Sequence, residues 1–274
     1  MISRALTTVL LTGFVAGILY TGAQMLRVTP LILEAEKYEI AEIALPHSHV
    51  ASGITHTHVL NGVALDVHQR VATPHENLPA AHDHAGVAHA TENWAPGDGA
   101  ERTFYTAVSN IVTGIAFSLM LVAVYLLRGK KVDMNSGLLW GAAGFAVFAL
   151  APALGLPPEL PGMTAAALES RQVWWIGTVI ATAIGIGLFT ESKTILAKIA
   201  ALALLAAPHL IGAPHPFLFE SNVPAELSAQ FAIASLVTSA FFWFVLGGTS
   251  GYLYKKLVIE SSSVLFKTSS LNPQ

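Results

Sequence analysis

The chain contains no cysteine and few charged residues, and both absences narrow its chemistry. Without cysteine it has no disulfides, iron–sulfur clusters or thiolate metal sites, so nitrogen and oxygen atoms would have to bind any metal. Only 11% of its 274 residues are charged, whereas a typical soluble domain has about 25%. Because 53% are hydrophobic and the mean hydropathy is +0.59, the composition excludes an ordinary soluble globule and indicates a membrane protein.

Signatures of several function classes are also missing. There is no G-x-x-x-x-G-K-[ST] loop for ATP and no H-E-x-x-H helix, and the histidine boxes of membrane di-iron oxygenases are not matched. A membrane enzyme would need a compact cluster of inward histidines and carboxylates, which the spacing does not supply. The 14 basic residues are few and scattered, which excludes a nucleic-acid footprint. We therefore expect neither an enzyme nor a nucleic-acid-binding protein.

Six apolar segments are long enough to cross a bilayer, which takes about 17–25 residues in a helix. The fourth and fifth are separated by only a few residues, so they form a tight hairpin or merge, and five spans is the alternative count. The pattern predicts an all-α, polytopic helical bundle with a long, irregular, histidine-rich loop outside the membrane. The six segments are residues 5–26, 105–127, 136–154, 172–190, 194–212 and 228–252.

This pattern divides the chain into four parts. Residues 1–27 form the first transmembrane helix, which we interpret as uncleaved because its apolar run is longer than that of a signal peptide. Residues 28–104 form the extracytoplasmic loop and residues 105–254 a bundle of about five helices. Residues 255–274 form a cytoplasmic tail.

Basic residues flank every alternate connection, and short Lys- and Arg-rich connections stay in the cytoplasm. We therefore predict a multi-pass protein of the bacterial inner membrane, with both termini cytoplasmic and the histidine-rich loop periplasmic. All eleven histidines then lie on the periplasmic side. The basic residues are Arg4, Arg128, Lys130, Lys131, Lys193, Lys198, Lys255 and Lys256.

The long loop concentrates the candidate metal ligands. Residues 28–104 hold nine of the eleven histidines and ten of the 17 acidic residues. Imidazole and carboxylate together suit divalent transition metals, and H-x-H pairs raise the local ligand density. The alternative interpretation is an expression tag or a pH-responsive linker, but tags are usually contiguous and terminal. The loop ligands that we predict are His47, His49, His56, His58, His82, His84 and His89.

A second group of candidate ligands lies where the loop and the fifth segment reach the outer end of the bundle. Prolines at 208, 214 and 216 bracket two histidines, and a proline there frees backbone carbonyls where a site could form. The alternative is an interfacial histidine satisfied by water or a carbonyl. We predict that this mouth receives the ion through Glu34, Glu36, Glu39, Asp98, Glu101, His209 and His215.

Polar side chains inside the spans are sparse. Gln24 and Asn110 could line a path, but a hydrogen bond between helices is the favoured interpretation. Glu159 could join the outer site, yet a simple ion pair with Arg171 is favoured. Small residues at four-residue spacing predict close helix packing or dimerisation. These pairs are Gly13/Gly17, Gly137/Gly141 and Gly247/Gly251.

Six motifs occur in order along the chain, and together they resemble the CbtA family of probable cobalt transporter subunits. The resemblance runs over most of residues 1–254. The motifs are PLILEAEKYE (30–39), WAPGDGAERT (94–103), GLLWGAAG (137–144), LAPALGLPPELPG (150–162), RQVWW (171–175) and PHLIGAP (208–214).

The resemblance implies cobalt uptake for cobalamin synthesis, together with a small single-span, histidine-containing partner subunit (CbtB-like). It also implies five spans. Our leading hypothesis is a subunit of a divalent metal importer, with Co²⁺ favoured over Ni²⁺, Zn²⁺ or Cu²⁺, whose loop captures metal and passes it to the mouth. The alternative is a membrane-anchored metal-binding protein that does not transport: a chaperone, buffer or sensor. Membrane lipid is a further expected partner, and homo-oligomerisation is left open.

Overall fold

A computed structural model describes residues 2–44, 96–216 and 221–260. All the regular elements within these ranges are helical, which confirms the predicted all-α class. They are α1 (Ile2–Arg27), α2 (Thr29–Ala44), α3 (Ala100–Arg128), α4 (Met134–Phe145), η1 (Ala146–Leu150), α5 (Ala151–Ala153), α6 (Leu168–Glu191), α7 (Ile195–Ile211), α8 (Ala225–Tyr254) and η2 (Lys255–Glu260).

Five helices of the described chain are long and apolar enough to cross a membrane: α1, α3, the α4–α5 segment, α6 and α8. Their positions match five of the six predicted segments. The remaining segment is α7, which has only 17 residues. It forms the predicted hairpin with α6, because only residues 192–194 separate the two helices.

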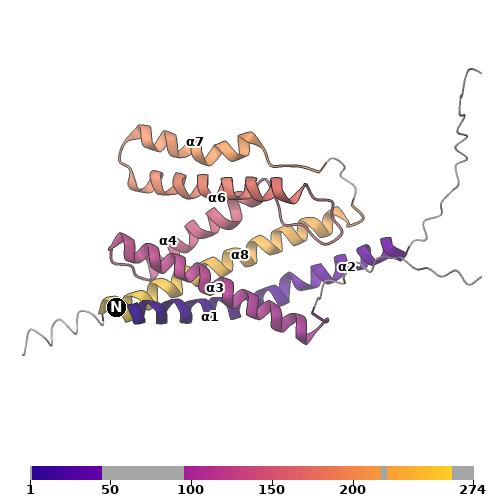
Figure 1. Cartoon of the computed structure of the whole chain (residues 1–274), viewed down its shortest axis with the longest axis horizontal. Coiled ribbons are helices and arrows are strands. Elements are labelled where there is room, and N and C mark those ends of the chain that lie inside the picture. Colours follow the sequence, from indigo (N-terminus) through magenta and orange to yellow (C-terminus); the bar gives the residue numbers. More distant parts are fainter. Residues whose placement is uncertain (1, 45–95, 217–220, 261–274) are drawn as a thin grey trace, which may run out of the picture. The chain divides into compact units, whose positions relative to one another are not determined.

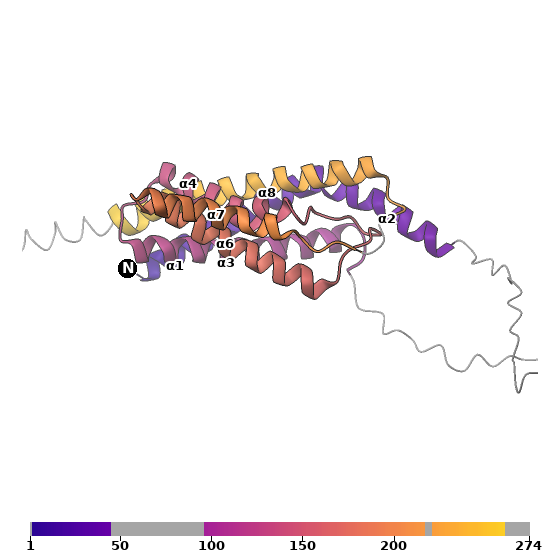
Figure 2. The same cartoon turned by 90° about the horizontal axis from the view of Figure 1, so that it is seen from above.

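The helices pack in two layers that run along a common direction (Figures 1 and 2). In one layer α1 packs against α3 and α8, and α4 packs against α8. The other layer is the α6–α7 hairpin, which packs on the first through η1 and α5. Helix α1 continues into α2, which extends past the bundle (Figure 1), so the first part of the predicted loop is helical.

The predicted glycine pairs bring helix backbones together within the chain. A Cβ at Gly141 would overlap the Trp243 carbonyl oxygen, and one at Gly247 would overlap the Gly137 carbonyl oxygen, so α4 and α8 touch along their backbones. A Cβ at Gly13 would lie 2.5 Å from Ile115 Cα, which brings α1 equally close to α3. The small residues therefore serve helix packing, which in lipid depends on close van der Waals contact.

The third span is one helix with a π-helical turn in it. Pro152 has no N–H, so the carbonyl of Phe148 loses its usual i+4 donor. The turn just before it shifts to i+5 bonding, in which the Ala151 N–H donates to the Ala146 carbonyl. Such π-helical turns occur often at functional sites. This one turns Phe148 and Pro152 toward α6.

Charged residues close one end of the bundle. Arg128 at the end of α3 donates to Glu191 at the end of α6 at 2.5 Å, and Lys130 lies 3.5 Å from the same carboxylate. Asp133 caps α4 by accepting from the backbone N–H and the hydroxyl of Ser136. These two hydrogen bonds lower the pKa of Asp133. The basic connections of the sequence therefore meet at one end of the helices.

Candidate metal site at the outer end of α1 and α3

The described residues contain only part of the predicted ligand set. The seven predicted loop histidines fall in residues 45–95, outside the described ranges, and the side chain of Glu39 is also not described. Glu34, Glu36, Asp98 and Glu101 lie together at the end of the bundle opposite the basic connections. Their surroundings show what this end can do.

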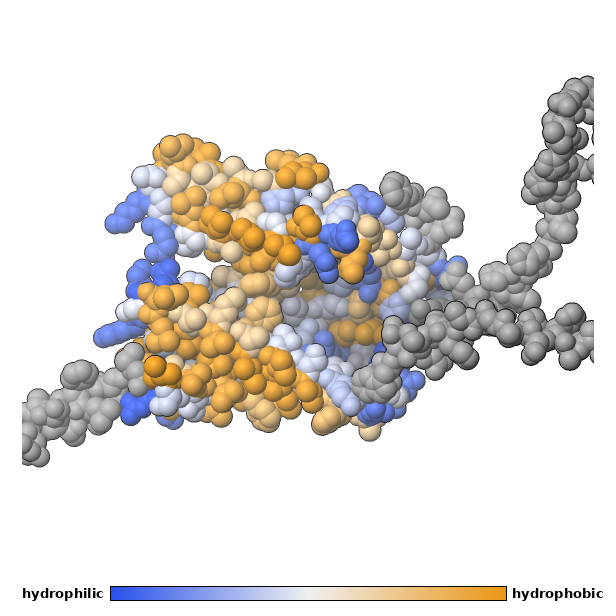
Figure 3. Space-filling view, in the orientation of Figure 1, coloured by the Kyte–Doolittle hydropathy of each residue, from blue (hydrophilic) through white to orange (hydrophobic). Residues whose placement is uncertain are grey.

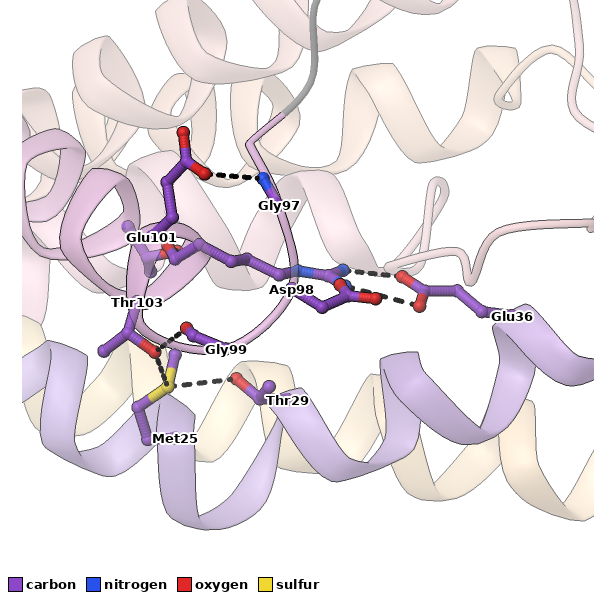
Figure 4. A network of polar contacts seen from close by, with 10 residues as sticks. Met25, Thr29, Glu36, Gly97, Asp98, Gly99, Glu101 and Thr103 are labelled. Atoms are coloured by element: carbon purple, nitrogen blue, oxygen red, sulfur yellow. Dashed lines mark hydrogen bonds and ion pairs between the residues drawn. The ribbon is translucent and has the colours of Figure 1, made fainter.

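One arginine holds two of the predicted carboxylates (Figure 4). Arg102, in the first turn of α3, donates to Glu36 on α2 at 2.6 and 3.3 Å, in a two-pronged contact. The same guanidinium donates to Asp98 at 3.2 Å. Glu36 and Arg102 are each 29% exposed, whereas Asp98 is 81% exposed. The guanidinium of Arg102 thus lies between the carboxylates of Glu36 and Asp98.

The other two carboxylates make local contacts. Lys37 donates to Glu34 at 2.6 Å, one turn along α2, and this hydrogen bond raises the pKa of Lys37. Glu101 accepts the backbone N–H of Gly97 at 3.1 Å and so closes the turn that precedes α3. Negative charge in the first turn of a helix also suits its dipole. Both groups are exposed enough to exchange these contacts with an ion.

A cavity of about 630 Å³ lies beneath the Arg102 network, between the α1–α2 junction and the start of α3. Asp98 and Arg102 form one side, and Gln24 and Met25 come from α1. The Met25 sulfur accepts hydrogen bonds from the hydroxyls of Thr29 and Thr103, each at 3.7 Å (Figure 4). The cavity therefore presents carboxylate, amide and hydroxyl oxygens and one thioether sulfur.

Below this cavity the predicted interhelical hydrogen bond is present. Asn110 on α3 is 9% exposed and donates from Nδ2 to Gln24 Oε1 at 2.6 Å and to Thr21 Oγ1 at 3.0 Å, both on α1. The bond satisfies amide groups that would be costly to leave unpaired in lipid. The polar lining of the cavity therefore ends at Gln24, where α1 and α3 are in direct contact.

His209 lies on the other layer. It is exposed near the end of α7, and its ring meets the ring of Trp174 on α6 edge-on, 6.0 Å between centroids. The Trp174 indole N–H donates to the carbonyl of Pro208 at 3.2 Å, which joins α6 to the end of α7. His215 is exposed in the segment that follows. The structure thus pairs His209 with α6.

Within the described ranges, no three histidine or acidic side chains are placed to share a metal ion. The individual ligand roles stay predictions. Among the predicted ligands, Glu36 and Asp98 are the two that contact the same side chain, that of Arg102. Our sequence reasoning missed Arg102 and Met25. Arg102 follows Asp98 by four residues and opens a helix, a spacing that predicts their contact. No sequence signal marked Met25.

Comparison with known families decides the class of this protein. Residues 2–255 match the family described as probable cobalt transporter subunit (CbtA). The chain belongs to the CbtA family. No curated protein and no solved structure matches it. CbtA membership and the apolar helices identify a membrane protein of a metal-transport family, and the word subunit in the family's description implies a partner component.

Proposed function

We propose that this CbtA protein is a non-enzymatic subunit of a divalent metal importer, with Co²⁺ as the favoured substrate for cobalamin synthesis. The histidine- and acid-rich residues 28–104 capture metal outside the membrane and pass it to the outer end of α1 and α3. Glu36 and Asp98 receive it there. A small single-span, histidine-containing subunit completes the transporter.

The observation that carries this proposal is the Arg102 network above the cavity. The carboxylates of Glu36 and Asp98 both contact the Arg102 guanidinium. Glu36 lies on α2, just before the undescribed part of the loop, and Asp98 and Arg102 lie just after it. Weak, exchangeable ligation of this kind suits transfer, since an ion must bind well enough to enter and loosely enough to leave. The net negative charge of residues 28–104 raises the local concentration of cations around it.

The orientation supports import. Arg128, Lys130 and Lys255 lie near one another at the end of the bundle opposite the candidate site. Basic residues favour the cytoplasmic side, so we place this end and both termini in the cytoplasm of an inner-membrane protein. In this orientation α7 crosses back beside α6, giving six passes although only five helices are long spans. Ligands that face the periplasm favour import over export.

The test combines binding and uptake on the same variants. We expect replacement of the seven loop histidines by alanine to slow initial cobalt uptake most at low external Co²⁺, because capture is lost. Glu36→Gln with Asp98→Asn slows uptake at all concentrations, because the receiving site is lost. Equal uptake by wild-type, variant and empty cells, each with the partner subunit, contradicts the proposal.

A second candidate function is a membrane-anchored metal-binding protein that hands its ion to another protein. The hydrogen bond between Asn110 and Gln24 closes the cavity beneath the Arg102 network, and this closure favours the alternative function. Binding of Co²⁺ by the purified chain without accumulation by cells would select this alternative.

A further inference from the structure

A second cavity, of about 860 Å³, lies between the two layers of helices. It is lined by residues of α1, η1, α5, α6 and α8 and by the connection that follows α5. Figure 3 shows the molecule hollowed between the α6–α7 layer and the layer below it, with walls paler than the orange outer surfaces. The cavity beneath the Arg102 network is lined by different residues.

Polar side chains descend one after another along the walls of this cavity. At a rise of about 1.5 Å per residue, Gln172 lies about 6 Å from the start of α6, whereas Ser235 and Ser239 lie about 15 and 21 Å from the start of α8. Tyr20 lines the facing wall on α1. A bilayer core is about 30 Å thick, so on a helix that enters it at residue 225 Ser235 lies near the middle and Ser239 beyond it.

Three of these groups have no hydrogen-bond partner in the described part of the chain. The side chains of Gln172, Ser235 and Ser239 make no hydrogen bond to any described residue, although serines and threonines elsewhere on α8 bond to the backbone of their own helix. An unpaired polar group facing lipid costs several kcal/mol. Several such groups around one space are satisfied if the space holds water.

The rim of the cavity carries an ion pair. Arg171 at the start of α6 lies 3.0 Å from Glu159 in the connection that follows α5, and both side chains are about one-third exposed or less. The pair is neutral overall, so an entering cation does not meet an unpaired guanidinium. The Glu159 carboxylate is the one charged oxygen ligand on the lining of this cavity.

Aromatic rings close the far end. Phe148 lines the cavity and stacks on Trp243, with 5.6 Å between centroids and 10° between ring planes. Trp243 is one helical turn beyond Ser239 and also packs against Phe117, at 4.7 Å. Trp243 is 2% exposed. The row of polar side chains therefore ends at packed rings, and Glu159 and Arg171 lie at the other end of the cavity.

We propose that this cavity is a water-filled vestibule that binds a hydrated divalent cation, with Gln172, Ser235 and Ser239 contacting its water shell and the Glu159 carboxylate accepting hydrogen bonds from that shell at the rim. The cavity is wide enough for an ion with its water shell, and neutral oxygen groups recognise that shell without stripping it. The proposal rests on the transport function proposed above and adds a second station, on the α6–α8 side, to the cation path.

The absence of native cysteine allows a direct test in the full chain in membranes, because an introduced cysteine is its one thiol. Ser235→Cys and Ser239→Cys are nearly isosteric and preserve the fold. Ile233→Cys, on the same helix and 64% exposed, is the matched control on the apolar outer surface. Each is treated from the periplasmic side with a charged, membrane-impermeant thiol reagent. Labelling is repeated with cobalt(III) hexaammine, an inert cation that resembles a hydrated metal ion and does not bind thiols.

We expect the charged reagent to label the cysteines at 235 and 239 at least tenfold faster than the cysteine at 233. Cobalt(III) hexaammine should slow the labelling at 235 and 239 several-fold, and adding Glu159→Gln should remove this protection. Labelling by an apolar maleimide alone would mean that lipid or another helix fills the space, and would overturn the proposal. Labelling without protection would mean water without a cation site, which also overturns it. Cobalt uptake by the same cells is a separate readout, so a failed vestibule is distinguished from failed transport.

Discussion

Asn110 on α3 donates a 2.6 Å hydrogen bond to Gln24 on α1. This contact joins the two spans directly beneath the cavity that Asp98 and Arg102 line. The residues are 86 positions apart, with the whole histidine-rich loop between them. The contact therefore fixes both ends of the loop to one point of the bundle. It has a structural role, and its Gln24 also lines the cavity next to the candidate site.

Replacing Asn110 by leucine should destabilise the protein, because Gln24 then keeps an unpaired amide among apolar groups. Hydrogen bonds between transmembrane helices contribute about 0.6 kcal/mol on average and at most about 1.7. In a double-mutant cycle with Gln24→Leu, the free energies of unfolding in detergent should show a coupling of this size. Zero coupling would show that the bond contributes nothing. Lost uptake with intact Co²⁺ binding would place the pair on the cation path.

Arg102 should compete with metal for Glu36 and Asp98. We expect Arg102→Gln to tighten Co²⁺ binding about fivefold, which corresponds to about 1 kcal/mol, the upper range for a partly exposed ion pair. Calorimetric titration of the purified chain measures the change. Arg102→Lys, which keeps the charge, is the matched control and should stay near the wild-type affinity. Weaker binding by Arg102→Gln would mean that Arg102 only positions the carboxylates and does not oppose the metal.

Gly141 and Gly247 should tolerate no larger side chain, because the backbones of α4 and α8 touch there. Overpacking a close contact typically costs about 1–3 kcal/mol, so Gly141→Leu should lower the yield of folded protein and its Tm. Gly177→Leu on α6 is the control, since a Cβ there meets nothing within 4 Å. Equal loss in both variants would argue against the α4–α8 contact.

The Asp133 cap predicts a pH dependence. Its pKa is lowered in the folded chain by the Ser136 hydrogen bonds, so its stabilising contribution is present above the ordinary aspartate pKa of about 3.9. The contribution is lost as the pH falls through the lowered, folded value. Asp133→Ala should therefore reduce the Tm at pH 7, and the difference from wild type should shrink in acid.

Asp133→Asn provides the control for this cap. Asparagine caps helices without a charge. The Tm of this variant at pH 7 should therefore stay close to that of the wild type, and the part of the pH dependence of Tm that Asp133 causes should be lost. A difference between wild type and Asp133→Ala that stays constant down to strongly acid pH would contradict the proposed role of the carboxylate.

The fold was readable from the sequence because apolar runs of span length leave few alternatives in lipid. The glycine pairs and the Asn110–Gln24 bond followed from the same physics, since small and polar residues within spans meet other helices. The fifth segment, residues 194–212, was harder to judge. Gly212, whose φ is +87°, ends α7 at Ile211 and leaves it 17 residues long.

The candidate sites were less predictable because their parts come from distant positions. Glu36 and Arg102 are 66 residues apart, and only the folded bundle brings the guanidinium to that carboxylate. The carboxylates of the mouth could be found by composition, whereas their shared counter-ion could not. The vestibule combines α1, α6 and α8, and its serines resemble any other helix serine until the absence of a hydrogen-bond partner is seen.

Cobalt accumulation by cells is the most direct test of the central claim that this CbtA chain imports metal. The cells express the chain with its small partner subunit, the partner alone, or the chain with Glu36→Gln and Asp98→Asn together with the partner. The account predicts accumulation well above that of the partner alone, and reduced accumulation in the double variant. Accumulation by the complete pair that never departs from cells with the partner alone would contradict import.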